Sequence, residues 1–164
     1  MNNALHLTVP EGLPFIDYQR EFDFPVGDVF RAHAEPDLIK EWLGPRGMRM
    51  EIDHYDFRPG GTYRYVHTGP DGVPYTFNGV FHTVRTNQFA VQTFEFGGYP
   101  DVVSLDFMAF EDLGGGRCRL NGHSVYPSLE ARDGMAASGM EGGMTEGYER
   151  LDELLNKGHS DTNG

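Results

Sequence analysis

Cysteine is almost absent from this chain of 164 residues, because Cys118 is the only one. A single cysteine cannot form a disulfide within the chain, and proteins without disulfides are typical of reducing compartments. We therefore expect a cytoplasmic protein. Because Cys118 falls on a predicted strand, it is expected to be a buried, unreactive thiol.

Basic residues are also scarce: 13 Lys and Arg stand against 25 Asp and Glu, which gives a net charge of −12. Nucleic acids and anionic membranes both require a basic surface, so neither is an expected partner. No apolar run approaches the roughly 18 residues of a membrane span, and residues 1–6 lack the layout of a signal peptide. These absences favour a soluble protein without membrane insertion.

Aromatic and aliphatic residues are abundant enough for one folded core, with 38% hydrophobic and 13% aromatic residues. Alternating or aromatic-rich runs bounded by Gly and Pro predict strands. Short helical patterns are predicted at residues 26–34 and 37–42. The predicted strands are residues 15–24, 49–56, 62–67, 75–84, 89–96, 102–110 and 118–125.

The last long helix is predicted at residues 136–156, where Met140, Met144 and Tyr148 recur at helical spacing on one apolar face. Acidic residues occupy the opposite face, so the apolar face is expected to lie against the sheet. Glycines recur there every four residues, although each destabilises a helix by about 1 kcal/mol relative to alanine. Two interpretations stay open: close approach to the sheet, or room for a ligand.

The order of elements is a strand, two short helices, six strands and a long helix. This order predicts an α+β fold in which an antiparallel meander packs against the last helix. We expect a loose arm at residues 1–14, one domain at 15–157 and a disordered tail at 158–164. A curved sheet around one helix also leaves a cavity, which is a usual place for a small molecule.

Four sequence blocks, in this order, resemble one protein family across residues 15–155. The blocks are Pro25…Val29-Phe30-x-Ala32…Pro36…Trp42-x-Gly44-Pro45, Asp56-x-Arg58-Pro59-Gly60-Gly61-x-Tyr63, Gly79-Val80, and Ser138-Gly139-Met140-Glu141-x-Gly143-Met144…Tyr148-x-Arg150-Leu151-x-Glu153-Leu154-Leu155. Together they resemble the bacterial single-domain members of the Hsp90-ATPase-activator-homologue family, within the START-like superfamily that includes polyketide cyclase-like and Bet v 1-like proteins.

The resemblance implies the helix-grip fold, in which a curved sheet of about six to seven strands grips a long C-terminal helix over a hydrophobic cavity. It also implies two kinds of partner. Related proteins bind lipids, sterols and polyketides, whereas the family name comes from a co-chaperone of Hsp90. That co-chaperone carries a separate N-terminal domain for much of its chaperone contact, and this chain has no room for one.

Candidate catalytic groups are few. The histidines show no metal-binding spacing, so neither a metal nor a cofactor is expected. If the turns are simple hairpins, His54 lies opposite about Tyr63 and His67 opposite about Thr76. Either histidine is a candidate polar anchor in the cavity. No nucleophile elbow surrounds any serine, so no catalytic residue is assigned.

The expected cavity lining combines aromatic strand residues with the apolar face of the last helix. It consists of Trp42, Tyr63, Tyr65, Phe77, Phe81, Met108, Met140, Met144 and Tyr148. Three functions follow as alternatives: a monomeric binding protein for a small hydrophobic, aromatic or lipid-like ligand, an accessory protein of an Hsp90-type chaperone, or a cyclase- or hydrolase-type enzyme that uses a cavity histidine or acid.

Overall fold

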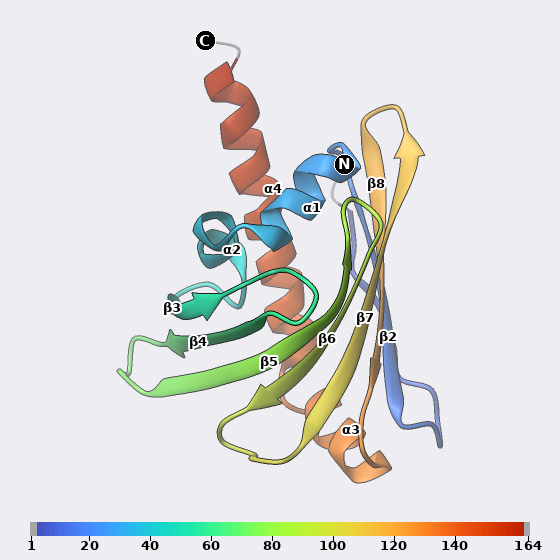
Figure 1. Ribbon diagram of the computed structural model, residues 1–164, viewed down its shortest axis with the longest axis vertical. Helices are drawn as coiled ribbons and strands as arrows, with labels where there is room; N and C mark the ends of the chain where they lie inside the picture. Colours follow the sequence, from blue (N-terminus) through green and yellow to red (C-terminus); the bar gives the residue numbers. More distant parts are fainter. Residues whose placement is uncertain (1–2, 163–164) are drawn as a thin grey trace.

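The computed structural model describes the backbone of residues 3–162 and the side chains of residues 3–158. Its α+β architecture confirms the predicted fold class, with one curved antiparallel sheet around a long helix (Figure 1). The strands are β1 (His6–Thr8), β2 (Phe15–Phe22), β3 (Arg49–Tyr55), β4 (Thr62–Thr68), β5 (Pro74–Arg85), β6 (Phe89–Phe96), β7 (Val103–Gly114) and β8 (Arg117–Val125). The helices are α1 (Val26–Ala34), α2 (Pro36–Trp42), α3 (Leu129–Ala136) and α4 (Met140–Thr162).

The sheet has eight strands in the order β1-β2-β8-β7-β6-β5-β4-β3, so it contains more strands than the six to seven that were expected. The additional strand is β1, which pairs with β2 through His6 and Gln19. Residues 6–8 therefore form an edge strand within the arm that was expected to be loose. Every neighbouring pair is antiparallel, and every pair except β2 and β8 is joined by a short connection.

The long helix begins later than predicted, because the helical conformation is interrupted at Gly139, between α3 and α4. Gly139 has φ +89°, a left-handed conformation that favours glycine and ends a helix. Ser128 caps α3, since its hydroxyl accepts a hydrogen bond from the amide of Ala131. The helix α4 then continues to Thr162, six residues past its predicted end at Asn156.

The core lies between the concave face of the sheet and the helices. α1 packs on β7 and β8, and α2 packs on α4 and β3 (Figure 1). Phe22, Val29, Leu120 and Leu151 are completely buried and join β2, α1, β8 and α4. Burying one such side chain stabilises the fold by about 1.5–3 kcal/mol, so this cluster anchors α4 at its middle, where Leu151 lies.

A bulge in β3 changes the expected register. Ile52 pairs with Tyr65 but His54 pairs with Arg64, so one extra residue, Asp53, is inserted in β3. A one-residue slip moves a side chain to the other face of a sheet.

Within the described residues, no helix combines the length and the apolar composition needed to span a membrane. Residues 158–162 of the expected disordered tail belong to α4, and residues 163–164 lie outside the described residues. The expected domain limits stay predictions.

Candidate functional site

A cavity of about 460 Å³ lies between the concave face of the sheet and α4. α1, α2 and the loop after α2 close one end of it, and the α3–α4 junction borders the other. A volume of this size is within the range of small-molecule sites, roughly 300–1,000 Å³. Its residues come from nearly every element, because the curved sheet and the helix enclose it from opposite sides.

One wall of the cavity is aromatic and belongs to β4, β5 and β6. Tyr63 and Tyr65 alternate along β4, so both side chains point to the concave face. Ring centroids lie 5.9 Å apart between Tyr63 and Tyr65, 5.3 Å between Tyr65 and Phe77, and 5.4 Å between Phe77 and Phe94. The result is a continuous row of stacked rings on which a planar ligand can lie.

The opposite wall is the apolar face of α4, where Met140, Gly143, Met144, Gly147 and Tyr148 border the cavity. The glycines on this face do not bring the backbone of α4 close to the sheet. Among the glycines of this face only Gly147 approaches other backbone closely, and its neighbours, Trp42 and Gly44, lie at the end of α2 and in the loop after it rather than in the sheet. A Cβ on Gly143 would meet a single atom, Cδ of Pro45 at 3.8 Å, so this glycine leaves cavity space open.

Two histidines border the cavity with unpartnered ring nitrogens. Nε2 of His67 and Nε2 of His33 are buried without a hydrogen bond. Burial lowers the pKa of each to about 4, so both rings are neutral at pH 7. His33 Nδ1 donates to the carbonyl of Val29 at 2.8 Å, which leaves its Nε2 as an acceptor. A buried polar atom without a partner is rare and costly, and here a ligand can supply the partner.

The cavity also contains a carboxyl group that the sequence analysis did not single out. Asp106 on β7 accepts a hydrogen bond from the Ser104 hydroxyl at 3.0 Å and is also bonded by Ser124. Burial raises the pKa of Asp106 to about 6. Part of its surface stays accessible because it faces the cavity. The sequence did contain a signal for Asp106, because alternate residues of a strand lie on the same face of the sheet. Once Met108 is assigned to the inner face, Asp106 lies on that face too.

All of the predicted lining residues except Phe81 border this cavity, although contact with a ligand stays a prediction. Phe81 is completely buried to one side of the cavity, where its ring packs against those of Phe57 and Tyr63 at 4.8 and 5.1 Å. His67 borders the cavity as expected, opposite Tyr75 rather than Thr76.

The placement of His54 in the cavity was wrong. Its ring is exposed and hydrogen-bonds Asp53 at 3.1 Å, because the bulge in β3 turns it away from the concave face. Among the described residues no group of three or more His, Cys, Asp or Glu side chains is arranged to hold a metal ion. Cys118 is buried, and burial raises the pKa of its thiol to about 12.

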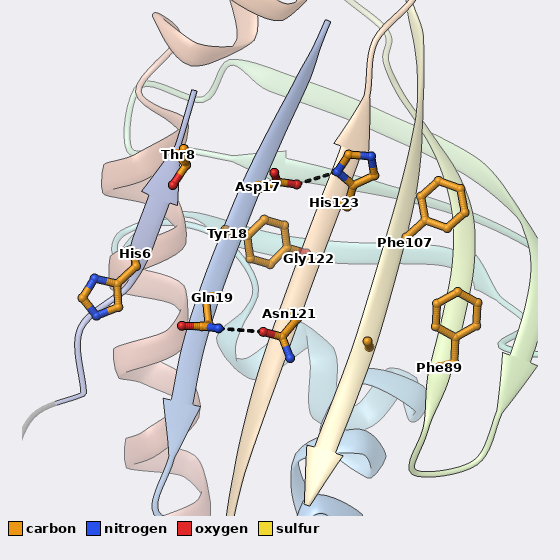
Figure 2. A pocket seen from close by; sticks show the side chains of 11 residues that line it. His6, Thr8, Asp17, Tyr18, Gln19, Phe89, Phe107, Asn121, Gly122 and His123 are labelled. Carbon is orange, nitrogen blue, oxygen red and sulfur yellow. Dashed lines mark hydrogen bonds and ion pairs between the residues drawn. The ribbon is translucent and has the colours of Figure 1, made fainter. Parts of the chain in front are cut away.

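A second hollow lies on the outer face of the sheet, across β1, β2, β8, β7 and β6 (Figure 2). Four of its polar side chains already have partners, since Asp17 pairs with His123 and Gln19 donates to Asn121 at 2.8 Å. It is open to solvent and lacks a covering element. The cavity beneath α4 is therefore the stronger candidate for a binding site.

Solved structures with the same architecture come from several bacteria. A protein of Rhodobacter sphaeroides has 25% identity and a TM-score of 0.86, over 94% of this chain and 99% of its own. A protein of Arthrobacter aurescens has 26% identity and a TM-score of 0.84, over 93% and 91%. Protein Ms6760 of Mycobacterium smegmatis, at 24% identity and a TM-score of 0.82 over 92% and 95%, shows the fold alone.

No protein with a curated function matches the sequence significantly. The family described as "Activator of Hsp90 ATPase homolog 1-like protein" matches residues 23–156, which include β3 to β8, all four helices in whole or large part, and every residue that borders the cavity except Tyr18. The match confirms the resemblance seen in the four sequence blocks. The chain belongs to the Activator of Hsp90 ATPase homolog 1-like family.

Proposed function

We propose that this protein binds one small hydrophobic or aromatic ligand in the cavity between the sheet and α4. The observation that carries the proposal is an unfilled volume of about 460 Å³ bordered by stacked rings, methionines and unpartnered polar atoms. A side-chain-filled core would have contradicted it. Native interiors contain few voids larger than a water molecule, so a cavity of this size needs a reason.

The chemistry of the lining suits an aromatic or flat apolar ligand. Rings from β4, β5 and β6 offer faces for stacking, and Met140 and Met144 adapt to irregular shapes. Buried tyrosine hydroxyls and the neutral His67 ring can orient the ligand by hydrogen bonds. Burial raises the pKa of Tyr65 and Tyr148, so both hydroxyls stay protonated and can donate at neutral pH.

An amide NMR titration of the labelled protein tests the proposal. The panel consists of fatty acids, flavonoids, sterols and polyketide-like aromatics. We expect shifts at Met140, Met144 and Tyr148 and on the facing strands, with exposed β3 residues such as His54 unchanged. If no compound shifts these residues, or if shifts occur only on the outer face around His123, the cavity is not the binding site.

An accessory role with an Hsp90-type chaperone is the second candidate, and family membership is the observation that favours it. The test mixes the purified chaperone with this protein and measures ATP turnover. Acceleration supports the role, and an unchanged rate counts against it.

A cyclase or hydrolase activity would use the histidines and the carboxyl group that border the cavity, namely His33, His67 and Asp106. Given an activity, alanine substitutions at His67 and Asp106 test this alternative directly. Loss of turnover with intact ligand binding would support it. Unchanged turnover in both variants would remove these two groups from any mechanism.

A further inference from the structure

Asp106 presents a carboxylate to the cavity without a cation to balance it. Ser104 and Ser124 provide neutral hydroxyls, and no described Arg, Lys or His forms an ion pair with it. The buried guanidinium of Arg20 is already taken by Asp152 at 2.6 Å. Charged groups removed from water are nearly always paired, so a lone carboxylate in an apolar cavity points to a missing positive charge.

The surroundings of Asp106 are aromatic. It is paired across the sheet with Gln92 on β6, whose amide Nε2 lies 3.4 Å from the Tyr63 hydroxyl. Phe94 on β6 and Tyr126 after β8 border the same cavity. Aromatic faces attract cations through their negative quadrupole, with a strength of about 0.5–2 kcal/mol per contact. A carboxylate beside several rings is therefore suited to an organic cation.

We infer that the cavity takes a ligand with a single positive charge, an amine joined to an aromatic or otherwise apolar body, with Asp106 as its counter-ion. This inference rests on the proposed function and adds the charge class of the ligand. A metal ion fits less well, because among the described residues Asp106 belongs to no group of three or more His, Cys, Asp or Glu side chains that could complete a coordination shell.

Three indoles of similar size separate charge from shape: tryptamine is a cation, tryptophol is neutral and indole-3-acetate is an anion. Isothermal titration calorimetry at pH 7.5 gives each Kd. We expect tryptamine to bind at least about tenfold more tightly than tryptophol, equivalent to about 1.4 kcal/mol, and indole-3-acetate to bind most weakly. Equal affinity for tryptamine and tryptophol would overturn the inference.

The variant Asp106→Asn removes the charge and keeps the shape. It should bind tryptophol as the unmodified protein does, with the tryptamine preference lost. The matched control is Glu130→Gln, which removes one negative charge from an exposed position in the first turn of α3 and should keep the preference. If the tryptamine preference survives in Asp106→Asn, or disappears in Glu130→Gln, it comes from the overall charge of −12 and not from Asp106. Either result overturns the inference.

A pH series on the unmodified protein gives a second measurement that needs no variant. Because the pKa of Asp106 is about 6, the tryptamine preference should fall between pH 8 and pH 5, while tryptophol binding stays constant. The other titratable groups that face Asp106 are Tyr18, Tyr63, Tyr65, Tyr126 and Tyr148, and burial raises the pKa of each. The cavity histidines are neutral above about pH 4, so they do not change the charge of the cavity over this pH range. A tryptamine preference that does not depend on pH would therefore contradict the role of Asp106.

The outcomes also separate this inference from the proposed function. If a neutral compound of the NMR panel binds in the cavity and tryptamine gains no advantage over tryptophol, the cavity proposal stands and the charge class is wrong. If neither the indoles nor any panel compound binds, both are overturned.

Discussion

Two neighbouring glycines in the first turns of α4 provide a matched test of the cavity. Gly143 borders the cavity, whereas Gly142 is exposed and has nothing within 4 Å of an added Cβ. Both have ordinary helical backbone, so leucine can replace either without backbone strain. Gly143→Leu places its side chain toward the ligand space, and Gly142→Leu places the same side chain in solvent.

The two variants should gain stability but differ in binding. Leucine has nearly the helix propensity of alanine, so each substitution should stabilise α4 by about 0.8–1 kcal/mol. For a chain of 164 residues this corresponds to a rise in Tm of about 2–4 °C. Gly143→Leu gains up to about 2 kcal/mol more if its side chain becomes buried in the cavity. Ligand affinity should fall at least about tenfold in this variant and stay unchanged in Gly142→Leu.

Differential scanning calorimetry and NMR titration measure both effects on the same samples. Gly143→Ala serves as an intermediate, because its Cβ makes only an ordinary contact with Pro45. Equal binding by Gly142→Leu and Gly143→Leu, both folded, would refute the reasoning that Gly143 keeps space open for a ligand. A Gly143→Leu variant that is destabilised would show that the space is too small for the added side chain.

Three further predictions concern Asp106, His67 and Leu151. The folded-state pKa of Asp106 is raised to about 6, above the ordinary value of 3.8, so its stabilising contribution is complete below about pH 4 and is lost as pH rises through 6. Urea unfolding should therefore show that Asp106→Asn is more stable than the unmodified protein by about 1–3 kcal/mol at pH 8 and equally stable near pH 4. A stability difference that does not change with pH would contradict the raised pKa of Asp106. His67→Leu removes an unpartnered buried nitrogen, so it should keep or raise Tm while lowering the affinity for any ligand that hydrogen-bonds the ring. The control His54→Leu changes an exposed ring and should alter neither Tm nor affinity. Equal loss of binding in both variants would remove His67 from the site. Leu151→Ala should destabilise the fold by about 2–5 kcal/mol because Leu151 is completely buried, whereas Leu129→Ala, at 43% exposure, should change stability by less than about 0.5 kcal/mol; similar values would contradict the position of the core.

Local sequence patterns were sufficient for most of the fold. The Gly-Pro and Gly-Gly turns marked the strand ends, and the alternation of Tyr63 and Tyr65 on β4 correctly assigned both to the concave face. What the patterns missed depends on longer-range geometry. A bulge at Asp53 is invisible in a strand of alternating residues, and it moved His54 out of the cavity.

Other differences arose because single residues override a periodic pattern. Gly139 adopts a left-handed conformation, so α4 begins at Met140 rather than at residue 136, and α3 precedes it as a separate helix. Phe81 has the pattern of a lining residue, but its contacts with Phe57 and Tyr55 cover it, and those depend on how the turn after β3 folds back. Asp106 was missed because an acid on a strand of a strongly acidic protein is expected to face solvent.

The central claim is that a ligand occupies the cavity beneath α4, and contact between ligand protons and methionine methyl groups tests it most directly. With [13C-methyl]methionine protein saturated with the tightest compound of the panel, we predict intermolecular NOEs to Met108, Met140 and Met144, which border the cavity. Met50 packs on the core without bordering the cavity and should show none. NOEs to Met50 alone, or to no methionine while binding is saturated, would contradict the account.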